Sequence, residues 1–195
     1  MLKEINFDNI RIINPCIDYI DSYRIAIEEH RRNKVIDFAY PKVRTKRQIT
    51  AFFKKLDRFS RGTDIPGGYV PTTSFWLVDG YNYLGSGDIR HYLTDNLRKL
   101  GGNIGYSIRP AAWRCGLGTI QLSMLLNEAK KLRIQKPIVT CFNENIASAK
   151  IIEKNGGVLI KKICNRFDGE DRLTRIYEID LTHIFNYDMM SKSLE

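Results

Sequence analysis

Two glycines and an arginine between residues 114 and 118 are the residues whose spacing best suits a chemical task. Gly116 and Gly118 stand one residue apart, Arg114 precedes them, and a helical pattern follows at once. The first amides of a helix have no partner within the helix, and the helix dipole adds positive potential there. Glycines let a phosphate approach the backbone, and the arginine adds a fixed charge. The segment therefore predicts an anion site for a phosphate-bearing ligand.

Two common phosphate-binding motifs do not fit this segment. A nucleoside-triphosphate loop requires a lysine after its second glycine, whereas Thr119 follows Gly118 here. A dinucleotide motif requires a third glycine where Gln121 stands, and an acid near the end of the next strand, where Cys141 and Phe142 stand. The simpler alternative, that the glycines only permit a tight turn from a strand to a helix, stays open at this point.

The elements that must position this loop follow from the apolar pattern. Residues 103–109 alternate, with Ile104, Tyr106 and Ile108 on one face, which predicts a strand before the loop. Residues 118–134 repeat their leucines at helical spacing, which predicts a helix after it. Further strands are predicted over 74–78, 83–90, 137–142, 158–164 and 173–180, and further helices in the N-terminal third and over 145–155. This order favours a mixed α/β sheet.

Length and composition indicate one folded domain. The chain has 195 residues, of which 43% are hydrophobic and 27% charged, and it shows no repeat or linker, so we expect a single domain over 1–195. No apolar run approaches the roughly 20 residues of a membrane span. The four cysteines form no C-x-x-C pair and the N-terminus lacks a signal pattern, so we expect a cytoplasmic protein with reduced thiols. The net charge of +9 favours polyanionic partners.

The order of strand, Gly-x-Gly loop, helix, short strand and a second motif resembles the GNAT superfamily of N-acetyltransferases. The shared motifs match at Gly116, Gly118, Asn145, Ser148, Lys154 and Gly156. The resemblance covers about residues 74–180. It implies an α/β (α+β) fold with a mixed, mostly antiparallel central sheet and helices on both faces. Residues 1–72 would then supply N-terminal helices and an acceptor-side loop, and residues 74–180 the cofactor-binding core.

The resemblance also implies ligands and the residues that bind them. Acetyl-CoA would be the co-substrate, an amine the acceptor, and no metal would take part. The backbone amides of Arg114, Cys115, Gly116, Leu117, Gly118 and Thr119 would bind the pyrophosphate of the cofactor. The strand end at Tyr106 and Ile108 would pair with the pantetheine arm like an added strand. Asn145 would bond to the pantetheine, with a helix N-cap as its alternative role, and Ser148 belongs to the same motif.

Three positions depart from the family pattern. Trp113 stands where the family has arginine or glutamine, so either Trp113 or Arg114 would meet the pyrophosphate. Ile152 stands where many members have a tyrosine that acts as an acid, and isoleucine cannot donate a proton. Asn103 stands near the position of a catalytic carboxylate in many members, and an amide cannot act as a base.

A base is nevertheless required, because a primary amine is protonated at neutral pH. The candidates are Asp88 and His91, at and just after the end of the strand predicted over 83–90, and Glu144, after the strand predicted over 137–142. His91 titrates in a suitable range, but a histidine in a polar stretch is also an ordinary surface residue. Tyr106 is a candidate proton donor or a core residue of its strand. Cys141 lies in an apolar strand and is interpreted as core rather than as a nucleophile.

Three functions remain open at this stage. The first is an enzyme that transfers an acetyl group from acetyl-CoA to an amine of a small molecule or peptide by direct attack. The second is a catalytically silent CoA-binding module with a regulatory role. The third is a basic nucleic-acid-binding protein, suggested by charge alone and lacking the interleaved aromatic residues of a base-stacking surface. A homodimer is left open as well.

Overall fold

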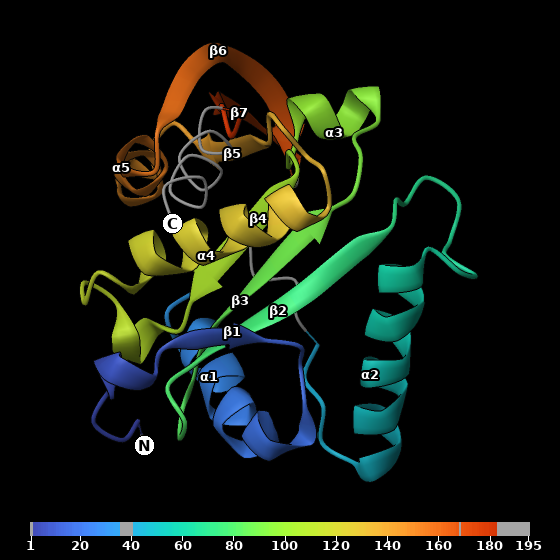
Figure 1. The fold of residues 1–195 in the computed structure, drawn as a ribbon, viewed down its shortest axis with the longest axis vertical. Coiled ribbons are helices and arrows are strands. Elements are labelled where there is room, and N and C mark those ends of the chain that lie inside the picture. Colours follow the sequence, from blue (N-terminus) through green and yellow to red (C-terminus); the bar gives the residue numbers. More distant parts are fainter. Residues whose placement is uncertain (1, 36–40, 168, 183–195) are drawn as a thin grey trace, which may run out of the picture.

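A seven-stranded sheet with the order β1-β2-β3-β4-β5-β7-β6 forms the centre of the molecule (Figure 1). The structure is a computed structural model that describes residues 2–35, 41–167 and 169–182. The strands are β1 (Arg11–Ile13), β2 (Thr72–Val78), β3 (Tyr83–Arg90), β4 (Ile104–Ile108), β5 (Ile138–Phe142), β6 (Gly157–Phe167) and β7 (Glu170–Ile179). Neighbouring strands are antiparallel except β4 and β5, which are parallel. The expected mixed, mostly antiparallel sheet is confirmed.

Helices cover both faces of this sheet, as expected. They are α1 (Ile20–Arg32), α2 (Lys46–Arg61), α3 (Asp95–Lys99), α4 (Leu117–Lys131) and α5 (Ile146–Lys154). On one face α1 and α2 pack against the sheet, and the ring of Tyr23 stacks on Trp76 with centroids 4.9 Å apart. On the other face α4 and α5 cover the strands. No described helix combines the length and the apolar character that crossing a membrane requires.

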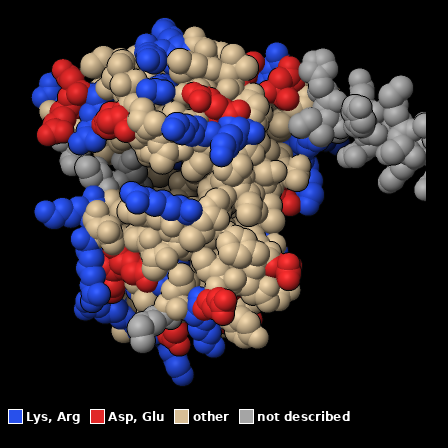
Figure 2. Space-filling view, turned by 90° about the vertical axis from the view of Figure 1, so that its left-hand side faces the viewer, with Lys and Arg blue, Asp and Glu red and all other residues tan. Residues whose placement is uncertain are grey.

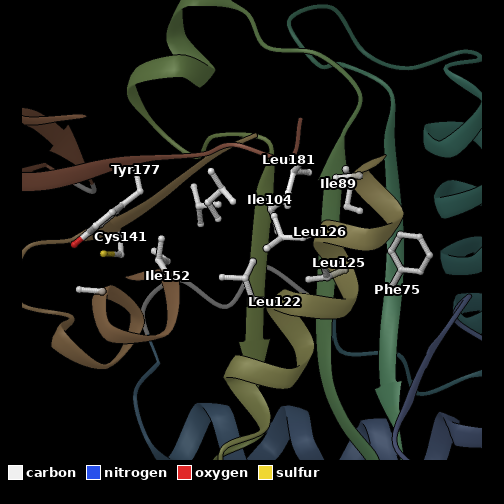
Figure 3. Packing of buried hydrophobic residues seen from close by; sticks show 14 residues of the cluster. Phe75, Ile89, Ile104, Leu122, Leu125, Leu126, Cys141, Ile152, Tyr177 and Leu181 are labelled. Atoms are coloured by element: carbon white, nitrogen blue, oxygen red, sulfur yellow. The ribbon is translucent and has the colours of Figure 1, made fainter. Parts of the chain in front are cut away.

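The leucine stripe of α4 fixes the position of the loop that precedes it. Figure 3 shows Leu122, Leu125 and Leu126 directed at the strands, where they join a buried apolar cluster. The helix comes so close to β3 that a Cβ atom on Gly87 would lie 2.5 Å from Cδ1 of Leu125. The N-terminus of α4, where the sequence predicts an anion site, is thereby held beside the end of β4.

Most predicted strands and α-helices occur with small shifts in their ends, but β1 and α3 were not predicted. β3 has the predicted bounds, and Gly156 follows α5 with a φ of 82°. Residues 11–13 lie in the third that we expected to be helical, but they form the edge strand β1, paired with β2. β1 and α3 are too short to carry a recognisable apolar period.

Candidate active site

A row of backbone amides at the start of α4 has no acceptor among the described residues. It runs from Arg114 to Gly118, and both Arg114 and Gly116 have left-handed backbones with φ of 64° and 79°. Such turns direct successive N–H groups toward one point and create an anion-binding concavity. The amide of Thr119 instead donates to the carbonyl oxygen of Gly116 at 3.1 Å. The structure therefore offers the predicted amides except that of Thr119, which belongs to the helix. We call residues 114–118 the amide nest.

The structure explains in two different ways why glycine occupies positions 116 and 118. Gly116 is the left-handed residue before α4, and nothing lies within 4 Å of a Cβ atom built on it. A Cβ atom on Gly118 would lie 2.6 Å from Cδ1 of Ile151, so Gly118 allows α4 to pack closely on α5. The left-handed backbone explains Gly116 and packing between helices explains Gly118, and that the two glycines let a phosphate approach stays a prediction.

The structure distinguishes the two side chains that could meet a phosphate at this loop. The indole N–H of Trp113 donates to the carbonyl oxygen of Ile108 at 2.7 Å, although the ring is 46% exposed. Arg114 is exposed and has no carboxylate within ion-pair distance among the described residues. Arg114 therefore remains the cation of this loop that can pair with an anion.

A cavity of about 510 Å³ opens between β4 and β5. The two strands are paired at a single position, Ile104 opposite Val139, and diverge beyond it. The cavity is lined by Arg90, Leu100, Gly101, Ile104, Gly105, Tyr106, Thr140, Cys141, Phe142, Asn145, Ser148, Phe167 and Thr174. It therefore lies beside the end of β4 that leads into the amide nest.

The edge of β4 that faces this cavity presents backbone groups to a ligand. The carbonyl of Asn103 and the N–H of Arg109 bond to β3 at 2.8 Å each. Because successive residues of a strand direct their backbone groups to opposite edges, those of Tyr106 and Ile108 point away from β3. The carbonyl of Ile108 already accepts a hydrogen bond from the indole N–H of Trp113. The N–H of Ile108 and both groups of Tyr106 remain for a strand-like ligand.

The second sequence motif lies at the start of α5 and reaches the same cavity. Asn145 is the N-cap of this helix, because its Oδ1 accepts from the amide of Ser148 at 3.0 Å, so the alternative role considered for it is confirmed. The hydroxyl groups of Ser148 and Tyr106 lie 3.0 Å apart. Burial raises the pKa of Tyr106, and the bond to Ser148 offsets only part of this effect. The Tyr106 phenol is therefore protonated, and able to donate, at neutral pH.

The residues that depart from the family pattern have structural roles. Ile152 is fully buried in the core beside Cys141 (Figure 3). Asn103 accepts from the amide of Ile138 at 3.0 Å and donates to the carbonyl of Arg90 at 3.2 Å, so it ties β4 to its neighbours. Cys141 belongs to the apolar cluster and burial raises the pKa of its thiol, which confirms its interpretation as a core residue, although it also borders the cavity.

Asp88 is the candidate base that lies next to the cavity. Its Oδ1 accepts a hydrogen bond from the Ser74 hydroxyl at 2.5 Å. Its neighbour Ile89 is buried under α4, so Asp88 points to the opposite face of the sheet, that of α1 and α2. In register it lies opposite Gly105, a cavity-lining residue without a side chain. Asp88 itself does not line the cavity, but its partner across the two strands, Gly105, does.

His91 and Glu144 lie outside the cavity lining. His91 Nε2 is 2.8 Å from the Thr73 hydroxyl, and burial lowers the pKa of His91. Glu144 is exposed and forms an ion pair with Arg172 at 3.5 Å. Of the four catalytic candidates, Tyr106 alone lines the cavity, and Asp88 lies opposite the lining residue Gly105 in strand register.

A buried ion pair that no sequence pattern indicated holds the chain between β4 and the amide nest. Arg109 is 1% exposed and binds Glu29 of α1 with two hydrogen bonds, one of them 3.1 Å long. It also donates to the Tyr83 carbonyl at 3.1 Å and the Ser22 hydroxyl at 3.2 Å. The amide of Ala111 donates to Glu29 at 3.2 Å. Burial works to raise the pKa of Glu29, but these bonds outweigh it and lower that pKa.

Acidification is expected to destabilise the protein through His30, the neighbour of this pair on α1. His30 is 1% exposed, and burial lowers its pKa to about 4, with Glu29 opposing and Arg109 adding to the effect. Because an ordinary histidine has a pKa of about 6.5, the stability present above about pH 6.5 falls as the pH approaches 4, by at most about 1.4 kcal/mol per unit. Urea unfolding across this range measures the loss. His30→Gln should flatten the profile, and an equally steep profile in the variant would assign the acid sensitivity to other groups.

Comparison with known proteins agrees with this geometry. The family model described as an acetyltransferase (GNAT) domain matches residues 12–158, which is more than half of the chain. No curated protein matches the sequence. Among the described residues, no three His, Cys, Asp or Glu side chains are grouped to hold a metal ion.

Several solved structures share the fold at low identity. The microcin C7 self-immunity acetyltransferase MccE, in complex with acetyl-CoA and AMP, has a TM-score of 0.67 and 16% identity over 89% of this chain and 93% of its own. The ribosomal L7/L12 α-N-protein acetyltransferase RimL, in complex with CoA, has a TM-score of 0.67 and 12% identity. The match covers 90% of this chain and 97% of its own. The putative acetyltransferase YncA from Salmonella typhimurium, with acetyl-CoA, has a TM-score of 0.58 and 16% identity, and the match covers 89% of this chain and 94% of its own. With its motifs, sheet and family match taken together, the chain belongs to the GNAT acetyltransferase family.

Proposed function

We propose that the chain transfers an acetyl group from acetyl-CoA to an amine of a small molecule or peptide by direct attack. The observation that carries this proposal is the continuity between the amide nest and the unpaired edge of β4 beside the cavity. The nest and Arg114 suit a pyrophosphate. The edge at Tyr106 and Ile108 suits the amide groups of a pantetheine arm, which would end at Ser148.

The residues on the two faces of the sheet decide where we place the thioester and the amine. Tyr106 and Cys141 lie on the face of α4 and α5, whereas Thr140 and Phe142 alternate with Cys141 and lie on the opposite face. The cavity therefore passes through the gap between β4 and β5. We assign the thioester to the α4 and α5 side and the amine to the other side, where Asp88 adjoins it.

In this reaction the amine nitrogen attacks the thioester carbonyl carbon. Asp88, directly or through one water molecule, takes the proton that the nitrogen must lose. The new C–N bond forms, the C–S bond breaks, and the electron pair leaves on the thiolate of CoA. Ser148 donates a proton to that thiolate and recovers one from Tyr106, which regains its proton from solvent.

The other two functions have weaker support. A silent CoA-binding module would be consistent with the structural use of Ile152 and Asn103, which removes two family positions from catalysis. For nucleic-acid binding, Figure 2 shows lysine and arginine side chains interspersed with aspartate and glutamate on the face in view, rather than a continuous basic stripe.

Thermal unfolding with CoA, acetyl-CoA and ATP tests the cofactor site. CoA at about 100 times its dissociation constant should stabilise the protein by about 2.7 kcal/mol, a shift of several degrees that ATP does not give. Gly116→Ala should weaken CoA binding about ten-fold, because it disturbs the nest by about one charge-assisted hydrogen bond.

Gly156→Ala is the matched control for this variant. Gly156 has a φ of 82° and, like Gly116, empty space around a Cβ atom, so the backbone strain of about 1–2 kcal/mol is the same. It lies outside the nest, and CoA binding should be unchanged. Release of CoA thiol with a panel of amines then tests catalysis. Binding without turnover would support the silent module, and no shift with either CoA species would overturn the proposal.

A further inference from the structure

The cavity has a second half that the pairing of acetyl-CoA with β4 does not use. Arg90, Thr140, Phe142 and Thr174 line it on the sheet face opposite α4 and α5. Thr140 and Phe142 alternate with core residues of β5, Thr174 lies opposite Phe142 in register, and Arg90 follows a core residue of β3. We call these residues and Phe167 the acceptor half.

Arg90 brings a guanidinium without a carboxylate partner to this half. Its Nη1 donates to the carbonyls of Gly101 and Gly102 at 3.1 and 2.9 Å. Across residues 2–35, 41–167 and 169–182 no carboxylate lies within ion-pair distance of Arg90, and Nε and Nη2 have no acceptor. Arg172 differs, because it is neutralised by Glu144 and Glu170 at 3.5 and 3.0 Å. Arg90 is therefore the cation of the cavity wall that can bind an anion.

Thr174 supplies a second unused donor. The residue is 2% exposed, and its hydroxyl has no hydrogen-bond partner in the described part of the chain. A buried hydroxyl without a partner is unfavourable, and a hydrogen-bonding ligand in the cavity would relieve that cost. The rings of Phe142 and Phe167, with centroids 5.2 Å apart, add an apolar wall beside it.

The charges along β3 match an acceptor with two charged groups. Asp88 and Arg90 are two residues apart on the same face of the strand, about 7 Å along it, and carry opposite charges. An amine that also bears a carboxylate or a phosphate could direct its nitrogen to Asp88 and its anionic group to Arg90.

We propose that the acceptor is a small primary amine with a carboxylate or phosphate group, held by Arg90 and Thr174 in the acceptor half. This proposal rests on the proposed acetyl transfer and specifies its substrate class. The volume of about 510 Å³ must also hold the reactive end of acetyl-CoA, which leaves room for a small acceptor.

Paired amines test the proposal on the full chain. Phenylalanine is compared with phenylalaninamide, and phosphoethanolamine with ethanolamine, by CoA thiol release and by thermal unfolding in the presence of CoA. The carboxylate or phosphate member should have a KM at least ten-fold lower than its neutral partner and should shift the unfolding midpoint more. The two pairs separate a carboxylate from a phosphate as the preferred anion.

Substitutions in the cavity wall test whether its residues cause the preference for anionic amines. Arg90→Gln should raise the KM of the anionic amine by about 10- to 100-fold more than that of its neutral partner. Thr174→Val, which removes an unpartnered hydroxyl and should not destabilise the fold, should raise the same KM about three-fold or more. Arg98→Gln on α3 removes the same charge outside the cavity and should leave the preference intact.

The outcomes keep the two proposals apart. A midpoint shift with CoA, together with equal KM values and equal shifts for the paired amines, overturns the acceptor proposal and leaves the acetyl transfer standing. A preference that persists in Arg90→Gln also overturns it. If neither CoA species shifts the midpoint, the proposed function fails. The paired amines are therefore also measured without CoA, where an absence of any Arg90-dependent shift counts against the acceptor half as an anion site.

Discussion

Replacing Arg109 by methionine is expected to lower the free energy of unfolding by about 3–5 kcal/mol. The substitution leaves the Glu29 carboxylate without its partner in a largely buried place and removes the bonds to Tyr83 and Ser22. Because Arg109 joins β4 to the loop that leads into the amide nest, CoA binding should weaken as well. Urea unfolding, with and without CoA, measures both effects.

Two further variants separate the buried pair from a general loss of charge. Arg61→Met breaks an exposed ion pair with Asp57 on α2 and should change stability by less than about 0.5 kcal/mol. Glu29→Leu combined with Arg109→Met should recover much of the loss, because two apolar residues replace two buried charges. If Arg109→Met costs less than about 1 kcal/mol, the pair does not hold this junction.

Much of the fold was predictable because its central elements are regular. The alternation around Tyr106 and the leucine stripe after Gly118 each follow from one face packing on the core. The structure buries Ile104 and the leucines of α4 and partly buries Tyr106 and Ile108. Gly156, one of the motif positions, follows α5 with a left-handed backbone, a local feature that a glycine in the sequence displays directly. Family motifs then identified the amide nest and the start of α5.

The parts that escaped prediction depend on contacts between distant residues. Glu29 and Arg109 are 80 positions apart, and each alone looks like an ordinary charged residue. Arg90 and Thr174 share a wall because β4 and β5 separate after one paired position, and no local pattern encodes that separation. The only available signal was an arginine at the end of a strand whose neighbours alternate between apolar and polar.

The largest loss of activity is expected from removing the hydroxyl of Ser148. Ser148→Ala should lower kcat about 100-fold, the usual range of general acid catalysis, with little change in the KM for acetyl-CoA. The fold should tolerate the change, because the cap at Asn145 accepts from the backbone amide of Ser148 and not from its side chain. Steady-state release of CoA thiol measures the effect.

Tyr106→Phe tests whether the two hydroxyls act as one relay. The Tyr106 phenol lies 3.0 Å from the Ser148 hydroxyl, and burial raises its pKa, so it can return the proton that Ser148 gives to the thiolate. Tyr106→Phe should therefore lower kcat, and adding it to Ser148→Ala should cause little further loss, because groups that act as a unit are not additive. Tyr92→Phe, at an exposed tyrosine, should leave kcat unchanged. Losses that multiply in the double variant would show two independent contributions and exclude the relay.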